Sequence, residues 1–222
     1  MTTLSDVWPL FDLRISSPRL ELRPVHDEDL PGVIDAVLAG IHDPSVMPFG
    51  VPWTDAPRDV LIRETAKHQW RLRAAVEPDN WTLNFVILSE GVPIGMQDLG
   101  TRDFSITKTV TTGSWLSQPH QGKGLGKEMR AAVLLFAFDH LGAEVAESEA
   151  AVWHKASLGV SHSLGYQDTG LRRTVGRPGE LSEQQEVRLE SEQFNRPDWN
   201  VVVEGLEAAR RDLIASRATA RD

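Results

Sequence analysis

A glycine-rich turn between a strand and an apolar helix is the feature that most constrains this chain. The alternating segment 110–116 predicts a strand, and segment 127–141 predicts a helix that is apolar nearly all round and therefore buried. Three glycines interrupt both patterns between these segments: Gly122, Gly124 and Gly126. Glycine lets a backbone approach a ligand closely, and the amides at a helix start bind anions. The turn therefore predicts a phosphate or pyrophosphate site, to which Lys123 and Lys127 add positive charge.

Three phosphate-binding patterns compete for this turn, beside a structural turn that binds nothing. A Walker A loop requires G-x-x-x-x-G-K-[ST], but Gln121 stands at its first glycine and Glu128 at its last position. A dinucleotide fingerprint requires G-x-G-x-x-G, but Lys127 stands at its third glycine. The remaining pattern, [QR]-x-x-G-x-[GA], is satisfied by Gln121, Gly124 and Gly126.

This third pattern is the pyrophosphate-binding signature of GNAT acyltransferases, and the chain resembles that family in three blocks. The run 113–138 resembles the acyl-CoA motif, and the block from Ala156-Ser157 to Leu164-Gly165-Tyr166 resembles the "N-x-x-S…LG[FY]" helix. The segment 19–24, RLELRP, is similar to the "RL-x-LRP" opening of the ribosomal-protein-alanine N-acetyltransferases, the RimJ/RimL-type branch. The resemblance is strong over about 92–170, moderate over 17–40, and does not extend past about residue 180.

The resemblance implies an α/β GNAT acyl-CoA N-acyltransferase fold, in which a mixed central sheet splays around the CoA site between flanking helices. It implies that backbone groups near Leu116 bind the pantetheine arm and that the amides from Gln121 to Lys127 bind the pyrophosphate. The residues expected to bind the cofactor are Trp115, Leu116, Gln121, Gly122, Lys123, Gly124, Leu125, Gly126, Lys127, His154 and Ser157. The donor is expected to be acetyl-CoA, or another acyl-CoA such as succinyl-CoA, with no metal.

The same resemblance suggests catalytic residues for direct transfer to a primary amine. Ser157 matches the serine that acts as the acid in the RimL type, and Ser114 is expected to line the acyl end of the groove. Asp103 is the favoured carboxylate, ahead of three others: Asp98, Glu128 and Glu149. The general base is either a carboxylate or an ordered water. Two positions depart from the family pattern, because His154 replaces an asparagine and Ser161 replaces a tyrosine.

Composition limits the partners and the compartment. The net charge of −9 disfavours nucleic acid and anionic membranes, and suits a small-molecule or peptide amine. No cysteine is present, which excludes disulfides and thiolate catalysis. No secretory signal is visible, so we expect a cytoplasmic protein, and a homodimer stays open. Two alternatives to the enzyme remain: a non-catalytic acyl-CoA or small-ligand binding protein with the same fold, and a nucleotide-binding protein that shares only the turn.

The remaining patterns predict one domain over 1–222, with a core at about 17–190 and a helical extension at 191–222. Strands are expected at 19–24, 81–88, 92–98, 110–116, 145–153, 172–175 and 186–190. Helices are expected at 30–41, 57–76, 127–141, 156–164 and 206–215, with another helix start at 195–198. Segment 42–55 is rich in Pro and Gly and should be irregular.

Overall fold

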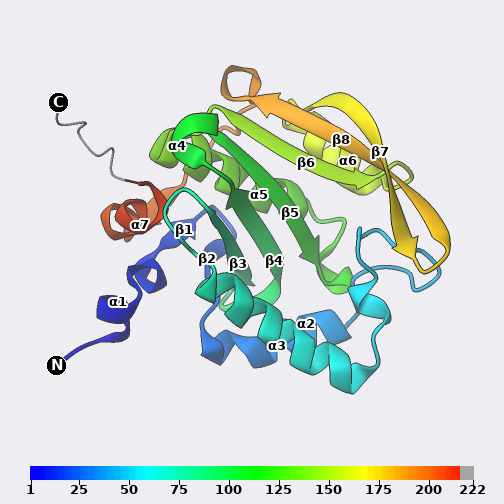
Figure 1. The fold of residues 1–222 in the computed structure, drawn as a ribbon, viewed down its shortest axis with the longest axis horizontal. Coiled ribbons are helices and arrows are strands. Elements are labelled where there is room, and N and C mark those ends of the chain that lie inside the picture. The colour runs from blue at the N-terminus through cyan, green and yellow to red at the C-terminus, as the bar shows by residue number, and fades with distance from the viewer. Residues whose placement is uncertain (216–222) are drawn as a thin grey trace.

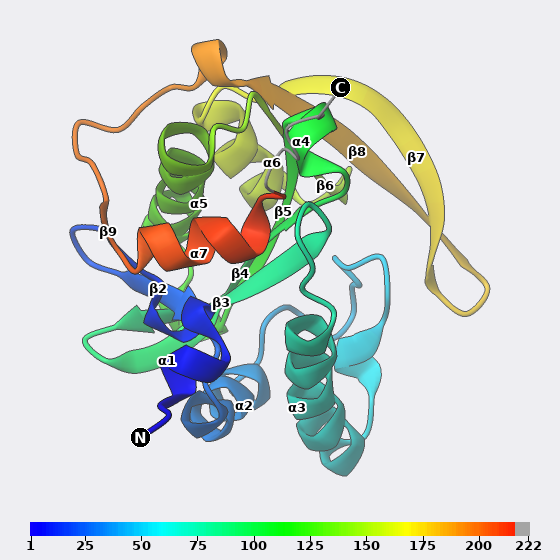
Figure 2. The ribbon, with the colours of Figure 1, turned by 60° about the vertical axis from the view of Figure 1, so that its left-hand side comes forward.

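The computed structural model describes residues 1–215 as one mixed sheet with helices on both faces (Figures 1 and 2). The strands are β1 (Arg14–Ser16), β2 (Glu21–Pro24), β3 (Trp81–Ser89), β4 (Val92–Thr101), β5 (Thr109–Leu116), β6 (Val145–Ala151), β7 (Gln167–Arg177), β8 (Glu180–Glu190) and β9 (Val202–Glu204). The helices are α1 (Leu4–Val7), α2 (Leu30–Leu38), α3 (Arg58–Ala74), α4 (Phe104–Thr107), α5 (Leu125–Leu135), α6 (Lys155–Ser163) and α7 (Leu206–Leu213). This arrangement confirms the predicted α/β fold.

The order of the strands in the sheet is β7-β8-β6-β5-β4-β3-β2-β1-β9. Every neighbouring pair is antiparallel except β5 and β6, which are parallel. The β5–β6 pairing covers only the three positions from Thr109↔Val145 to Thr111↔Glu147. Both strands continue beyond these pairs and move apart (Figure 1). The predicted splay of two central strands is therefore present.

The two faces of the sheet carry different apolar clusters. In β3, Phe85 and Ile87 join the large cluster that includes α5, whereas Val86 and Leu88 join a small cluster with residues of α2. This alternation is the ordinary period of a strand that is covered on both sides. As predicted, α5 is buried, and it continues as a wider helical turn over Phe136–Leu141.

Three expectations about elements were wrong or incomplete. The helix start expected at 195–198 is absent, because 195–201 is irregular and leads into β9. Strand β9 pairs with β1 at the sheet edge, so part of the C-terminal segment is strand rather than helix. The strands expected at 172–175 and 186–190 are the 11-residue strands β7 and β8. The end of the extension, residues 216–222, lies outside the described residues.

The β7–β8 hairpin reaches the irregular segment 42–55 (Figure 1). Arg177 forms an ion pair with Asp55 at 2.7 Å and donates hydrogen bonds to the carbonyls of Pro44 and Ser45. These contacts hold the hairpin and the segment together across one end of the splayed strands. Across residues 1–215 the helices are too short or too polar for any of them to span a bilayer.

Candidate active site

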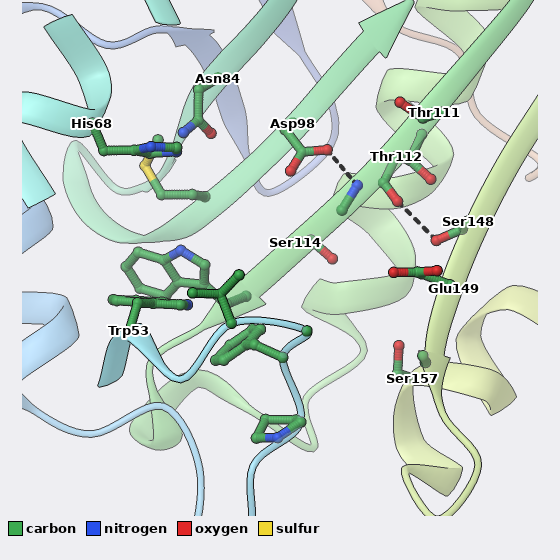
Figure 3. Close-up of a pocket in the computed structure, with 18 of the residues that line it drawn as sticks. Trp53, His68, Asn84, Asp98, Thr111, Thr112, Ser114, Ser148, Glu149 and Ser157 are labelled. Carbon is green, nitrogen blue, oxygen red and sulfur yellow. Dashed lines mark hydrogen bonds between the residues drawn. The ribbon is translucent and has the colours of Figure 1, made fainter. Parts of the chain in front are cut away.

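A cavity of about 1070 Å³ occupies the opening between β5 and β6. Its lining residues come from both faces of the sheet. Ser114 lies on the face covered by α5, where it accepts a hydrogen bond from Arg130 of that helix. Asn84 and Asp98 lie toward α3 (Figure 3). Ser148 and Glu149 line it from β6. The cavity therefore passes through the sheet, so that ligands from opposite faces can meet inside it.

Backbone groups of β5 face this opening. The N–H of Ser117 donates to the carbonyl of Ile94 on β4, so the odd-numbered residues of this stretch direct their backbone groups toward β4. The backbone groups of Ser114 and Leu116 consequently point toward β6, which has already moved away. A strand edge of this kind needs hydrogen-bond partners. An extended ligand lying between β5 and β6 would supply them.

The glycine turn lies where β5 leads into α5. Gly122 and Gly124 have φ of +71° and +79°, a left-handed conformation that favours glycine. Gln121 fixes the turn, because its side-chain amide donates to the carbonyls of Ile41 and Leu116 at 2.6 and 2.7 Å. The first amides of α5 lack partners within the helix, and the helix dipole makes this end positive. The geometry of the turn is thus compatible with the anion site that the sequence predicts.

A buried carboxylate secures the first turn of α5. Glu128 accepts hydrogen bonds from the Ser17 hydroxyl and from the backbone and side-chain nitrogens of Arg19. The Arg19 side chain also donates to the carbonyl of Lys123 in the turn. Glu128 therefore ties the segment before β2 to the anion site and is not available as a catalytic acid or base.

Asp98 lies on β4 directly opposite Gly113 of β5. Its carboxylate accepts the Gly113 N–H, and a Cβ at Gly113 would lie 2.7 Å from Asp98 Oδ2, so glycine allows this approach. Burial raises the pKa of Asp98, while the Gly113 N–H and the positive charge of Arg130 oppose that rise. The side chain still opens onto the cavity. A carboxyl with a raised pKa at this place can serve as a proton acceptor.

The comparisons with known proteins identify the family. A family model described as an acetyltransferase (GNAT) domain matches residues 19–167. The chain belongs to the GNAT acetyltransferase family. Its class of activity is therefore acyl-CoA-dependent N-acyl transfer.

Solved GNAT structures have the same fold at low sequence identity. RimJ from Mycobacterium smegmatis, in complex with a CoA disulfide, is 20% identical with a TM-score of 0.70, over 94% of this chain and 98% of that one. RimL, a ribosomal alpha-N-protein acetyltransferase in complex with coenzyme A, is 18% identical with a TM-score of 0.65, over 78% and 95%. A spermidine N-acetyltransferase chimera from Vibrio cholerae and hSSAT is 16% identical with a TM-score of 0.61, over 78% and 96%.

Four of the predicted site residues of this GNAT chain line the cavity: Ser114, Trp115, His154 and Ser157. Ser157 lies in the first turn of α6, beside Glu149 and across the opening from Ser114 (Figure 3). The helix begins after His154, so Ser157 is not its N-cap. Burial, and then the charge of His42, lower the pKa of His154, which favours a neutral ring. Leu116 and the turn residues Gln121–Lys127 are outside the cavity lining, at its outer end.

Asp103 is not brought to the cavity. It is exposed at the start of α4, and its carbonyl accepts the N–H groups of Ile106 and Thr107. Its left-handed backbone, with φ of 49°, explains why the chain reverses there. Of the four carboxylates considered from the sequence, Asp98 and Glu149 line the cavity, whereas Asp103 and Glu128 do not.

The irregular segment 42–55 forms one wall of the cavity. Trp53 lies between Phe49 and Trp115, with ring centroids at 5.4 and 6.2 Å, and all three rings line the cavity. By contrast, Trp81 is fully buried and donates to the carbonyl of Leu213. Segment 42–55 thus uses its aromatic residues to shape the cavity on the face that carries Asp98.

Sequence reasoning missed Arg130 and Ser148. Arg130 stands in the apolar helix and is only 4% exposed, yet it lines the cavity. A charged residue within an otherwise apolar helix was the signal, because such a group is rarely buried without a purpose. Ser148 has no comparable signal, because a serine in a strand usually makes a local hydrogen bond.

The structure leads to a test of the anion site at Gly124. Gly124→Asp and Gly124→Asn have nearly the same shape, and both residues tolerate a left-handed backbone. The aspartate places a negative charge where the pyrophosphate is expected to bind, so its CoA affinity should be at least about tenfold lower than that of the asparagine variant, or ~1.4 kcal/mol. Calorimetric titration with CoA measures both. Equal affinities in two folded variants would contradict the assignment.

Proposed function

We propose that this chain transfers an acetyl group from acetyl-CoA directly to a primary amine of a small molecule or peptide in the cytoplasm. The observation that carries the proposal is the cavity through the splayed strands, which is lined by Ser114 and Arg130 on one face and by Asp98 on the other. The donor would extend from the glycine turn along β5, and the amine would enter between α3 and segment 42–55. Two of the similar structures contain coenzyme A, which supports this class of donor.

In the proposed reaction the amine nitrogen attacks the thioester carbon, and the C–S bond breaks as the amide forms. The inward-facing N–H groups of Ser114 and Leu116 are placed to polarise the thioester carbonyl. Asp98 takes the proton that the amine nitrogen loses. We prefer it to Asp103 because Asp98 faces the cavity, whereas Asp103 lies outside its lining.

The departing thiolate needs a proton, and Ser157 is placed to donate a hydrogen bond to it. Ser157 is half-buried at the cavity, whereas Ser161, at the position of the tyrosine of many GNAT enzymes, is 3% exposed and outside the lining. The aromatic wall of Trp53 and Trp115 suits a cationic amine before it loses its proton. Spermidine and ribosomal-protein acetyltransferases among the similar structures support an amine acceptor.

The function is tested by thiol release from acetyl-CoA with a panel of polyamines, amino acids and peptides. We expect release that depends on one class of amine, together with an acetylated product of the matching mass. Without an acceptor the intact protein should gain no acetyl mass, because transfer is direct and the chain has no cysteine. CoA binding without release for any amine would favour a binding protein with this fold.

Asp98→Asn tests the general base. Its turnover should fall by ~10²-fold or more, and the loss of wild-type activity at low pH should occur above the ordinary aspartate pKa of about 3.9, because Asp98 must be ionised to act. The stability of the folded protein should not fall with the activity. A raised folded-state pKa lowers wild-type stability as pH rises through the window between the two pKa values, so the variant should melt no lower at neutral pH. Full activity with a folded protein would exclude Asp98.

Ser157→Ala tests the proposed acid. We expect kcat to fall by ~10–100-fold with little change in CoA affinity, because the thiolate is already a fair leaving group. The melting temperature should change little, since Ser157 does not cap α6. Ser163→Ala, on the same helix and outside the cavity, is the matched control. Equal kcat values for the two variants would leave Ser157 without a role in the reaction.

A further inference from the structure

Arg130 is a buried cation in a mostly apolar helix. It lies on α5 between Met129 and Ala131, which are 3% and 1% exposed, and is itself 4% exposed. Its side chain reaches the opening between β5 and β6, where it lines the cavity. Ionised groups in such positions are normally paired with an opposite charge, because burying a lone charge costs several kcal/mol.

This guanidinium forms no ion pair among residues 1–215, although Asp98 and other carboxylates line the same cavity. Arg130 donates to the hydroxyls of Ser148 and Ser114 at 3.2 and 3.1 Å, and its buried Nε has no hydrogen-bond partner. Asp98 is near enough to feel its charge but forms no ion pair with it. The buried Arg23, by contrast, is paired with Asp29 at 2.6 Å. We therefore expect a bound ligand to supply the negative charge that pairs with Arg130.

The position of Arg130 along α5 indicates which part of the acyl-CoA would carry the negative charge that pairs with it. Helix α5 starts at the glycine turn and runs back along β5, so deeper positions on the helix face deeper positions in the opening. The pyrophosphate belongs to the first turn, whereas Arg130 is five residues beyond Leu125, or about 7–8 Å along the axis. It contacts Ser114, where the thioester lies in the proposed function. The group that meets Arg130 is thus at the acyl end of the donor.

We propose that Arg130 binds the terminal carboxylate of a short dicarboxylic acyl group, so that the enzyme uses a dicarboxylic acyl-CoA in preference to a neutral acyl-CoA of equal length. This inference rests on the proposed function. A guanidinium binds a carboxylate through two parallel hydrogen bonds, and Arg130 has N–H donors beyond the two that it gives to Ser114 and Ser148. The amine nitrogen forms the amide, the C–S bond breaks, and the product carries a free carboxylate beside the new amide.

The test compares two stable thioether analogues, S-(3-carboxypropyl)-CoA and S-butyl-CoA, which differ only in the terminal carboxylate. Calorimetry on the full chain should show the carboxylate analogue binding at least about tenfold more tightly. Arg130→Met, which keeps the volume and removes the charge, should abolish that preference, and Arg130→Lys should keep part of it. Arg173→Met, at an exposed position of β7 outside the cavity, should leave the preference unchanged.

The stability of the variant provides an independent check. Removal of an unpaired buried charge should leave the melting temperature of Arg130→Met without ligand equal to or above that of the wild type. Equal binding of both analogues by the wild type would overturn the inference. So would a preference that survives in Arg130→Met, because the carboxylate would then bind elsewhere.

Failure of this inference differs from failure of the proposed function. If the function holds and the inference fails, acetyl-CoA is turned over and the two analogues bind equally. If the function fails, no acyl-CoA releases thiol with any amine, whatever the analogues show. Once an acceptor amine is identified, the same preference should appear in the kinetics. The kcat/KM for succinyl-CoA should be at least about tenfold above that for butyryl-CoA, and Arg130→Met should lose this difference.

Discussion

The end of pairing between β5 and β6 is the constraint on which the site depends. After Thr111 and Glu147 the two strands separate, and the backbone groups of β5 lose their neighbouring strand inside the molecule. Such groups are costly to leave without partners. The Arg177 contacts hold β7 and β8 against segment 42–55 at one side of the opening. The surrounding fold thus maintains the opening, and an extended ligand bound there would complete the interrupted sheet.

Charges in this region divide into those that hold the fold and those that face the cavity. Glu128 is buried and fully engaged with Ser17 and Arg19, so its charge fixes the start of α5. Asp98 and Arg130 are also enclosed, but neither forms an ion pair within the described chain. Burial without pairing is unfavourable for stability. Because both groups line the same cavity, we favour roles for them in ligand binding and in the reaction.

The sequence predicted the part of the site that depends on local backbone chemistry. Gly122 and Gly124 have the positive φ that a tight turn requires, and the apolar pattern after them predicted the buried helix. Site residues that depend on strand register were harder to identify from the sequence, because the sequence does not show which strand positions lie opposite one another. Asp98 was one of several carboxylates until its pairing with Gly113 placed it at the opening, and Asp103 follows it by only five positions. The strands β1 and β9, at one end of the sheet, have three residues each, too few to show a period.

Asp98 and Arg130 lie on opposite faces of the sheet, and the effect of the Arg130 charge on Asp98 would couple donor binding to proton transfer in the proposed reaction. The positive charge of Arg130 lowers the pKa of Asp98 against the rise that burial causes. An anionic acyl group bound to Arg130 would neutralise that charge, and the pKa of Asp98 would rise toward the value that burial alone produces. A higher pKa makes the carboxylate a stronger base, provided that it stays ionised at the working pH. The base would then be strongest when the donor is in place, which favours binding of the acyl-CoA before the amine loses its proton.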